Sequence, residues 1–400
     1  MRSNSYARPG SRRVHTRHFG PSTNRNRGGV NKQFIDPARF IKKANPASSS
    51  DYVARHAFAD FAIHPILKSN IAVKGYLTPS EIQDKTIPLG LAGRDVVGIA
   101  NTGTGKTAAF ALPILNKLLH QPDALGLIIT PTRELAIQIE EQCRQFAKNS
   151  GLSGALLIGG LTIGRQITAL KHNPRIIIGT PGRLKDHIRQ GTLNLSRAGM
   201  VVLDEVDRML DMGFIEDVRF ILDRLPIERQ SFFFSATLSP EVNRLIQTFT
   251  NDPITVDVKQ GETSDNVDQN VVKYNGKIER LDRLHDVLIA ANMGKALIFG
   301  DTKYGVERLA KELKIRGFKA DALHGGKTQG ARQRALDGFR ENKINILVAT
   351  DVAARGIDVV DITHVLNFDT PKTYDDYIHR IGRAGRAGRT GIALTFVEST

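Results

Sequence analysis

The sequence contains very little cysteine, no long apolar run and almost no acidic residues near its start. Cys143 is the only cysteine, so an intramolecular disulfide is excluded and a reducing compartment is favoured. The absence of any run of 18 apolar residues argues against a membrane-spanning helix. The opening residues, MRSNSYARPGSRR, lack the apolar core of a secretory signal. We therefore expect a cytoplasmic protein.

Positive charge is concentrated at the start of the chain. The formal net charge is +15, and residues 1–50 carry eleven Lys or Arg residues against one acid, Asp36. The other 350 residues are nearly balanced, with 45 basic and 40 acidic side chains. Such a basic arm is typical of nucleic-acid binding, and a solvated tail without function is the alternative. We infer that the arm tethers nucleic acid without sequence preference.

The composition of residues 1–50 predicts disorder, because Arg, Gly, Asn and Ser dominate. A mitochondrial transit peptide is disfavoured, since Gly, Pro and Asn would interrupt the amphipathic helix that it needs. Residues 34–37 and 40–41 form a small apolar patch within the arm. This patch is either a docking segment or has no role.

Two domains are expected from 400 residues, since this length exceeds a typical single core. Strand-like and helical patterns alternate along the chain, which predicts α/β domains with parallel sheets. We divide the chain into a disordered arm at residues 1–50 and a first α/β domain at residues 51–256. An exposed linker at residues 257–268 leads to a second α/β domain at residues 269–400. The expected strands are 96–99, 125–130, 155–158, 175–179, 200–203 and 232–235, then 296–299, 319–323, 344–349, 365–368 and 392–396.

The stretch DVVGIANTGTGKT, residues 95–107, has the pattern of a phosphate-binding loop between a strand and a helix. Gly103 and Gly105 let the backbone wrap closely around a phosphate. Lys106 is expected at the β- and γ-phosphates and Thr107 at Mg²⁺. The first position of the pattern is usually Gly and is Ala100 here. A chance glycine turn is the alternative.

Acidic and basic clusters follow other expected strands. Asp204 and Glu205 follow the apolar run 200–203, which predicts that Asp204 holds Mg²⁺ and that Glu205 accepts a proton from the attacking water. The run HRIGRAGRAGR, residues 379–389, lies in the second half, where no further phosphate loop is found. Arginines from a second lobe can reach a γ-phosphate from outside the first, so one nucleotide could couple closure of two lobes.

Together these residues resemble a DEAD-box ATP-dependent RNA helicase over residues 56–398. The resemblance is carried by Phe58 with GYLTPSEIQ, ANTGTGKT, PTRELA, GG, TPGR, DEVD, SAT, ATDVAARGID and HRIGRAGR, in the order of the family. It implies two tandem RecA-like domains, ATP and Mg²⁺ as ligands, and RNA as the partner, held through its backbone with little sequence preference. We expect a monomer, and the sequence identifies no protein partner.

The resemblance also implies a role for each matching residue. ATP would be bound by Tyr76, Gln83, Ala100, Asn101, Thr102, Gly103, Thr104, Gly105, Lys106, Thr107 and Asp358. Tyr76 would stack on adenine, which Gln83 would read. Catalysis would involve Lys106, Asp204, Glu205, Arg383 and Arg386, with Mg²⁺ at Thr107 and Asp204. Hydrolysis would be coupled to closure by Asp207, Ser235, Thr237 and His379. The RNA backbone would be lined by Arg133, Gly160, Gly182, Arg183 and Thr350.

Two departures from the family pattern stand out. The family has Ala where this chain has Val206, and we predict that ATPase activity survives. Members usually continue into a further helix, so either the chain is a fragment or its second lobe has an uncovered face. Two rival functions are a DNA translocase of the same architecture and an ATP-gated RNA clamp or annealing chaperone.

Overall fold

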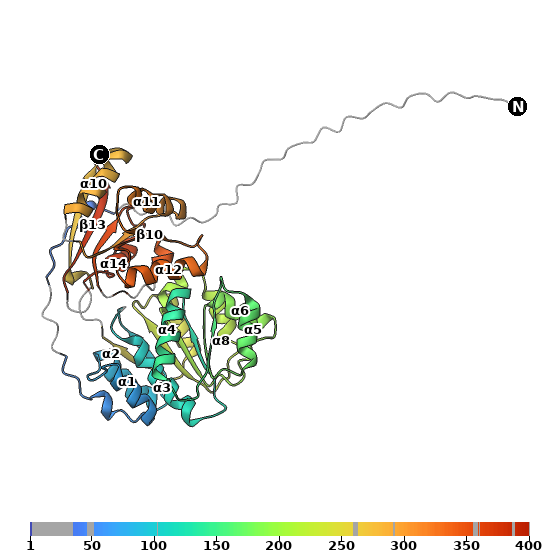
Figure 1. The fold of residues 1–400 in the computed structure, drawn as a ribbon. Helices are drawn as coiled ribbons and strands as arrows, with labels where there is room; N and C mark the ends of the chain where they lie inside the picture. The colour runs from blue at the N-terminus through green and yellow to red at the C-terminus, as the bar shows by residue number, and fades with distance from the viewer. Residues whose placement is uncertain are drawn as a thin grey trace.

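The chain folds into two α/β lobes, which lie one above the other in Figure 1. The structure, a computed structural model, describes residues 1, 35–45, 52–101, 103–258, 263–290, 293–354, 359, 361–385 and 389–399. We call residues 52–258 the first lobe and residues 263–399 the second lobe. Among the described residues, no helix is long and apolar enough to cross a membrane.

The first lobe is built on a seven-stranded sheet with the order β3-β4-β2-β5-β6-β1-β7, and each ladder runs parallel. Its strands are β1 (Val96–Ile99), β2 (Gly126–Ile129), β3 (Gly154–Leu157), β4 (Ile176–Gly179), β5 (Met200–Asp204), β6 (Gln230–Ser235) and β7 (Ile254–Asp257). The five strands β1, β2, β4, β5 and β6 are buried along their whole length, which explains their continuous apolar sequences.

Helices cover both faces of this sheet. One core lies beneath α1 (Pro65–Val73), α2 (Glu81–Leu91), α3 (Lys106–His120) and α4 (Arg133–Phe146), beside the short turn η2 (Phe58–Asp60). The other lies beneath α5 (Ile163–Lys171), α6 (Pro181–Arg189), α7 (Val206–Asp211), α8 (Ile215–Leu222) and α9 (Pro240–Phe249). Alternate side chains of β1 enter the two cores, as the pleat of a strand requires.

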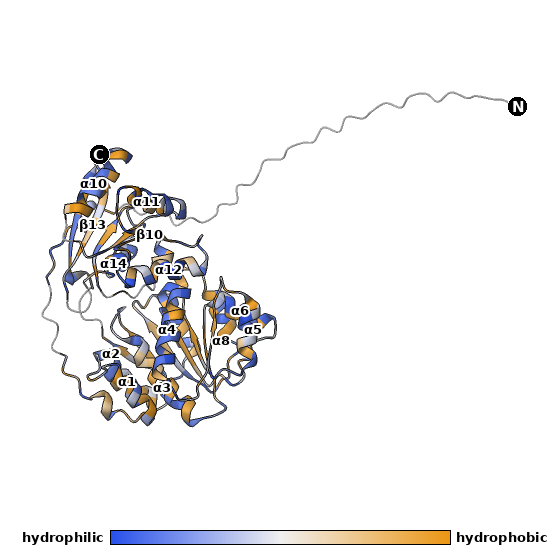
Figure 2. Ribbon diagram, in the orientation of Figure 1, coloured by the Kyte–Doolittle hydropathy of each residue, from blue (hydrophilic) through white to orange (hydrophobic). Residues whose placement is uncertain are grey.

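The second lobe has a six-stranded sheet in the order β10-β11-β9-β12-β13-β8. Its strands are β8 (Val267–Tyr274), β9 (Lys295–Phe299), β10 (Ala320–Leu323), β11 (Ile346–Ala349), β12 (Ile362–Asn367) and β13 (Gly391–Glu398). Its helices are α10 (Gly276–Ala290), α11 (Lys303–Ile315), α12 (Gln329–Arg340), α13 (Asp351–Ala354) and α14 (Tyr374–Ile381), and η3 (Thr263–Asn266) precedes β8. In Figure 2 the strands are largely orange, the colour of hydrophobic residues. The outer surfaces of the helices carry more blue, the colour of hydrophilic residues.

Threonine caps fix where several helices begin. Thr132, Thr302, Thr328 and Thr373 each precede a helix and accept a backbone N–H with the side-chain hydroxyl. This satisfies one of the N–H groups that a helix start leaves unpaired. Polar residues therefore follow directly after the strands, at the sheet edge where ligands of parallel α/β sheets bind.

The two parallel-sheet domains predicted from the sequence are confirmed. The expected strands recur within a few residues of their expected bounds, but β7 and β8 were not expected. Strand β8 begins at Val267, inside the stretch that we interpreted as an exposed linker, and it pairs with β13 along its full length. Its mixed sequence, VDQNVVKY, belongs to an edge strand, and only tertiary pairing with β13 distinguishes it from a loop.

Residues 35–45, which we call the strap, are ordered against the second lobe. The prediction of disorder over 1–50 is therefore wrong for this segment, whereas residues 2–34 and 46–51 lie outside the described residues. The strap contains the short helix η1 (Pro37–Phe40), capped by Asp36, and a bridge from Lys42 to Gln269 on β8. Phe40 is fully buried in the second-lobe core, so the apolar patch is a docking segment.

Candidate nucleotide and RNA site

The phosphate loop connects β1 to α3 and is shaped by two glycines. Gly103 and Gly105 have φ values of 88° and 94°, a conformation that favours glycine. Lys106 is buried, and its Nζ donates to the Ala100 carbonyl at 3.1 Å across the loop. The loop therefore surrounds the ammonium group with backbone at the start of a 15-residue helix, where a phosphate is favoured. Thr107 lies in the first turn of the same helix.

Gln83 and Ser80 connect α2 to this loop. The Gln83 Nε2 donates to the Gly105 carbonyl at 3.1 Å, and Ser80 Oγ donates to the Thr104 carbonyl at 2.7 Å. The Gln83 Oε1 accepts from the Ser80 backbone N–H at 2.8 Å. A Cβ at position 105 would lie 2.3 Å from Gln83 Nε2. The Gln83 amide is thus bonded to the loop, and among the described residues one of its N–H groups and one of its oxygen lone pairs have no partner.

Tyr76 sits beside the aromatic core of the first lobe. Its ring makes edge-on contacts with Phe58 and Phe146, at centroid distances of 5.3 Å and 5.6 Å. The Phe58 N–H also donates to the carbonyl of Leu77, next to Tyr76. These contacts hold the ring of Tyr76 in place, and they join the upstream aromatic Phe58 to the stretch that contains Gln83.

Asp204 lies at the carboxyl end of β5, facing the phosphate loop. Its Oδ1 is 3.9 Å from Lys106 Nζ and has no hydrogen-bond partner among the described residues. Burial raises the pKa of the Asp204 carboxyl, and Lys106 opposes that rise. A buried carboxylate oxygen without a hydrogen-bond partner among the described residues, with Thr107 in the first turn of α3 as a second ligand, suits Mg²⁺, which commonly uses one or two carboxylates plus substrate phosphates. No larger cluster of metal-ligating side chains occurs in the described part of the chain.

Glu205 directly follows Asp204 and has an unusual backbone conformation. Its φ is 56°, which is uncommon for a residue with a side chain, and it occupies the N-cap position of α7 without a side-chain capping hydrogen bond. Arg208 Nη1 donates to Glu205 Oε2 at 2.6 Å, and both groups are buried. Burial alone would raise the pKa of Glu205, but Arg208, Lys106 and Arg383 together hold it below its ordinary value. Glu205 therefore stays ionised, and cations of both lobes, Lys106 and Arg208 of the first and Arg383 of the second, stabilise its charge.

Asp207 links the acidic cluster to the end of β6. Its Oδ2 accepts from the backbone N–H groups of Ala236 and Thr237, both at 3.0 Å, and from the Thr237 hydroxyl at 3.1 Å. The Asp207 N–H donates to Ser235 Oγ at 3.3 Å. Burial would raise the pKa of Asp207, but Lys106, Arg208 and His379 lower it overall. His379 belongs to α14 of the second lobe, so its field reaches this network.

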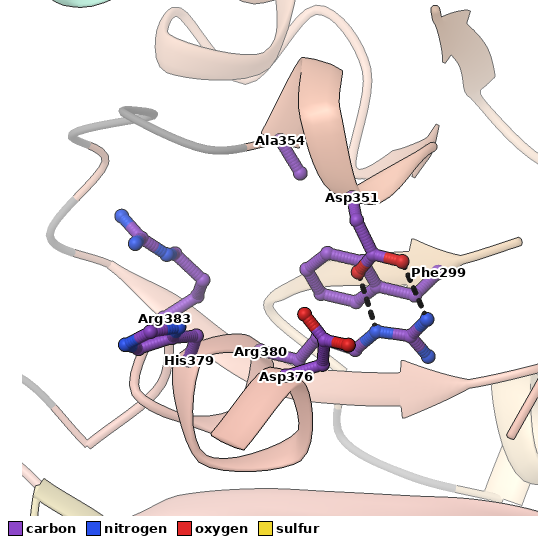
Figure 3. A pocket seen from close by; sticks show the side chains of 7 residues that line it. All are labelled: Phe299, Asp351, Ala354, Asp376, His379, Arg380 and Arg383. Atoms are coloured by element: carbon purple, nitrogen blue, oxygen red, sulfur yellow. Dashed lines mark hydrogen bonds and ion pairs between the residues drawn. The ribbon is translucent and has the colours of Figure 1, made fainter. Parts of the chain in front are cut away.

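The second lobe faces the acidic cluster with a pocket lined by Phe299, Asp351, Ala354, Asp376, His379, Arg380 and Arg383 (Figure 3). Arg380 is not available to a ligand, because its Nε and Nη2 donate to both carboxylate oxygens of Asp351 at 2.6 Å and 2.7 Å. His379 and Arg383 extend away from this pair on one side in Figure 3. Arg380 is thus a structural residue that fixes α14 to α13, which leaves Arg383 nearer the first lobe's cluster.

Expected RNA-binding residues of the first lobe gather at the ends of β2, β3 and β4. The Arg133 guanidinium lies across Gly159 and Gly160, where an added Cβ would come within 2.8 Å and 2.3 Å of it. Arg183 Nη1 donates to the Leu161 carbonyl at 3.0 Å. Burial, together with Arg332, lowers the pKa of Arg133, although such a group stays charged. Gly182 is the second residue of α6, next to Arg183, and a Cβ added there would lie 3.8 Å from Asp217 Oδ2.

A buried ion pair joins the lobes next to this cluster. Arg332 on α12 donates Nε to Glu134 Oε1 and Nη2 approaches Glu134 Oε2, both at 2.8 Å. Gln329 Nε2 donates to the same Oε1 at 3.3 Å, and Gln329 lies 3.7 Å from a Cβ built on Gly160. Figure 1 shows α12, which carries Arg332, above α4, which carries Glu134. The pair places the expected RNA-binding surface at the junction of the two lobes.

Some expected residues are not brought into these contacts. Thr102, Asp358 and Arg386 lie outside the described residues. Thr350 directly follows β11, and its carbonyl accepts from the N–H groups of Ala353 and Ala354. The sequence reasoning assigned no role to Arg208, Glu134, Arg332 or Arg380. The three-residue spacing of Glu205 and Arg208 signals a helical ion pair, whereas Glu134 and Arg332 are 198 residues apart and leave no local signal.

Comparisons with known proteins agree with this geometry. The family model for the DEAD/DEAH box helicase matches residues 80–245, and that for the helicase conserved C-terminal domain matches residues 276–388. This chain belongs to the DEAD-box ATP-dependent RNA helicases. It is 45% identical over 342 residues to the DEAD-box ATP-dependent RNA helicase CshA of Bacillus licheniformis, covering 85% of this chain and 70% of that protein.

Other relatives support the same family and fold. The Bacillus subtilis CshA is 46% identical over 344 residues, covering 85% of this chain and 69% of that helicase. S. cerevisiae Dbp5 bound to RNA and ADP BeF3 superposes with a TM-score of 0.76 at 31% identity, covering 86% of this chain and 90% of Dbp5. A structure of Mss116p bound to ssRNA and AMP-PNP gives a TM-score of 0.77 at 27% identity, covering 86% and 75% of the two chains. As a DEAD-box protein, the chain is an ATP-hydrolysing RNA helicase with two RecA-like lobes.

Proposed function

We propose that this DEAD-box helicase hydrolyses ATP at the junction of its lobes and uses closure of the lobes to open short RNA duplexes locally. One observation carries the proposal. Glu205 is a buried carboxylate that accepts from Arg208 Nη1 at 2.6 Å, and its pKa is lowered by Arg208, by Lys106 of the phosphate loop and by Arg383 of the second lobe. The carboxylate that we assign to water activation is therefore under the electrostatic influence of the phosphate loop of one lobe and of a cation of the other.

In the first lobe, the contacts described above support the following assignments. Lys106 and the N–H groups of the loop bind the β- and γ-phosphates. Gln83 is connected to the same loop by its hydrogen bond to the Gly105 carbonyl. Glu205 orients the attacking water and accepts its proton. Thr107 and Asp204 would hold Mg²⁺, which would neutralise charge on the phosphate oxygens. Tyr76 and the free positions of the Gln83 amide receive the adenine.

In the second lobe, Arg383 contributes positive charge at the γ-phosphate in the closed state. We assign Arg386 and Asp358 to the γ-phosphate and the ribose on the basis of the motif alone. His379 stabilises the ionised Asp207, which is bonded to Thr237 and Ser235. Loss of the γ-phosphate after hydrolysis would then weaken the contact between α14 and the network from Asp207 to Thr237.

RNA is proposed to lie over Arg133, Gly160, Gly182, Arg183 and, across the junction, Thr350. Arginine and glycine backbone groups are suited to phosphate oxygens, so binding should be largely independent of base sequence and sensitive to salt. Because the Glu134–Arg332 pair joins the lobes beside Gly160, a strand that requires both lobes binds best to the closed form. Both halves of the site come from one chain, which supports a monomer.

The experiment compares purified wild-type protein with Lys106→Ala and Glu205→Gln. We expect RNA to stimulate ATP hydrolysis by the wild type, more than single-stranded DNA does, and Lys106→Ala to abolish it. Glu205→Gln should bind ATP and RNA but lose turnover and repeated unwinding. If the wild type with saturating RNA hydrolyses no more ATP than Lys106→Ala, the proposal is wrong. If Glu205→Gln leaves strand separation and annealing unchanged, turnover serves neither, and the coupling is wrong.

A further inference from the structure

The strap belongs to the second lobe in space but to the first lobe in sequence. Phe40 is fully buried beside Tyr377 of α14, with ring centroids 4.7 Å apart, and Ile35 is buried in the same core. The Arg39 guanidinium lies 3.8 Å above the Tyr374 ring. These contacts anchor the strap to the helix that also carries His379.

Polar contacts fix the strap to the start of β8. The backbones of Lys42 and Gln269 exchange two hydrogen bonds, at 3.1 Å and 2.8 Å, which closes the edge of the second sheet. The Lys42 ammonium pairs with Asp265 at 2.7 Å. The Asn45 N–H donates to the Asp265 carbonyl at 2.9 Å, and the Ala44 N–H to Asp268. The strap thus ends beside η3, where the chain arrives from the first lobe.

The next described residues are fixed to the first lobe. Asp84 on α2 is buried and accepts from the Tyr52 hydroxyl, from the Arg55 N–H at 2.7 Å and from His56 Nδ1 at 2.6 Å. Helix α2 packs against β7, the strand from which the chain leaves the first lobe. Between Asn45 and Tyr52 lie only six residues, so whatever their path, the two anchors are at most about 25 Å apart.

We propose that the strap, whose end at Asn45 is bonded to Asp265, is a second tether between the lobes that limits how far they separate and rotate. A single connecting segment leaves the lobes free to rotate about it. Two crossings that are fixed side by side on the second lobe oppose that rotation. The tether keeps the second lobe near the phosphate loop when neither ATP nor RNA is bound, and so favours closure by raising the effective concentration of one lobe at the other.

The test measures the distance between lobes by single-molecule energy transfer. Dyes are attached at Lys171→Cys on α5 and Lys311→Cys on α11, which are both exposed. The native Cys143 is buried, and burial raises its pKa to about 12, so it should react slowly. Phe40→Ala removes the buried anchor, and Ile41→Ala, which truncates an exposed neighbour, is the matched control. A third protein carries about twenty Gly and Ser residues inserted between Asn45 and Tyr52, which extends the reach to about 95 Å.

Without ligands, we expect a narrow distribution of dye-to-dye distances for the wild type and Ile41→Ala. Phe40→Ala and the insertion should give a broad distribution that extends to larger distances between the lobes. Trypsin cleavage at residues 39–43, compared with cleavage at residues 2–34, reports docking independently. Cleavage at residues 39–43 should be about tenfold or more faster in Phe40→Ala, and unchanged in Ile41→Ala and in the insertion protein. The tether is refuted if the wild-type strap is cleaved as fast as that of Phe40→Ala, or if the insertion leaves the distribution unchanged. These readouts do not depend on ATP hydrolysis, so they can fail or succeed separately from the proposed function.

Discussion

Glu134 of the first lobe and Arg332 of the second lobe form a two-point ion pair in which both side chains are buried. Glu134 follows the Arg133 that covers Gly160, and Arg332 lies on the helix that meets this surface. The pair exists only when the lobes are together. It therefore stabilises the closed arrangement beside the proposed path of the RNA backbone.

Arg332→Ala should weaken the closed complex, because it leaves the Glu134 carboxylate buried without its cation. A loss of about 2 kcal/mol or more is expected, equivalent to about 30-fold in RNA affinity. Fluorescence anisotropy of labelled RNA with a non-hydrolysable ATP analogue measures it. Arg334→Ala on the same helix is exposed and is the control. Equal affinities for the two variants would show that the pair contributes nothing to closure.

Gly160→Ala should lower RNA affinity by displacing the Arg133 guanidinium. The new Cβ would lie 2.3 Å from Arg133 Nη1, and the backbone φ of 81° also disfavours a side chain. We expect about tenfold weaker RNA binding, with little change in ATP affinity measured without RNA. Gly164→Ala lies in α5 with open space around it and serves as the control. If RNA binding by Gly160→Ala equals that of the control, Arg133 does not contact RNA from this position.

Asp207→Asn should destabilise the first lobe in a pH-dependent manner. The pKa of Asp207 is lower in the folded state, so its stabilisation is complete above the unfolded value of about 4 and is lost as the pH falls through the folded value. We expect a loss of about 1–3 kcal/mol at neutral pH, because two N–H donors lose their carboxylate. Melting curves from pH 7 downwards should show the wild type and variant converging below about pH 4.

The comparison for this prediction is Asp223→Asn, which changes an exposed carboxyl in the same lobe. It should melt like the wild type at every pH. A gap between wild type and Asp207→Asn that stays constant down to pH 3 would contradict the assignment of the stabilisation to the ionised carboxylate.

Val206→Ala restores the residue that is usual in the family and tests whether valine impairs catalysis. Val206 is buried in the core beneath α7, α8 and α9. The contacts described above for Asp204, Glu205 and Asp207 are made by the groups of those residues and not by the Val206 side chain. We expect a loss of about 1–3 kcal/mol in unfolding by denaturant, because two methyl groups leave a cavity. RNA-stimulated turnover should stay within about threefold. A rise of tenfold or more in the variant would mean that Val206 obstructs the site.

Local sequence patterns predicted the sites that a single strand and loop create. The apolar run before Asp204 and the glycines before Lys106 each determine a strand, a turn and the side chain that follows it. These signals lie within about fifteen residues, so no knowledge of the other lobe is needed. The positions of Lys106 and Asp204, 3.9 Å apart, follow because their strands end at the same edge of a parallel sheet.

Contacts between distant segments could not be read in this way. Phe40 looks like a stray aromatic in a polar arm, and its burial depends on Tyr377, 337 positions later. Arg380 and Arg383 belong to the same arginine run. Only the packing of α14 against Asp351 shows that Arg380 is used in a structural ion pair. The amide of Gln83 likewise could not be connected to Gly105 until α2 was placed beside the loop.

The central claim, that one triphosphate is held between Lys106 and Arg383, is tested most directly by single-turnover hydrolysis with saturating RNA. Arg383→Ala is compared with Arg389→Ala, an exposed arginine of the same run. The account predicts that Arg383→Ala slows hydrolysis about 10³-fold or more while ADP, which lacks the γ-phosphate, binds with unchanged affinity. Hydrolysis by Arg383→Ala at the rate of Arg389→Ala would contradict it.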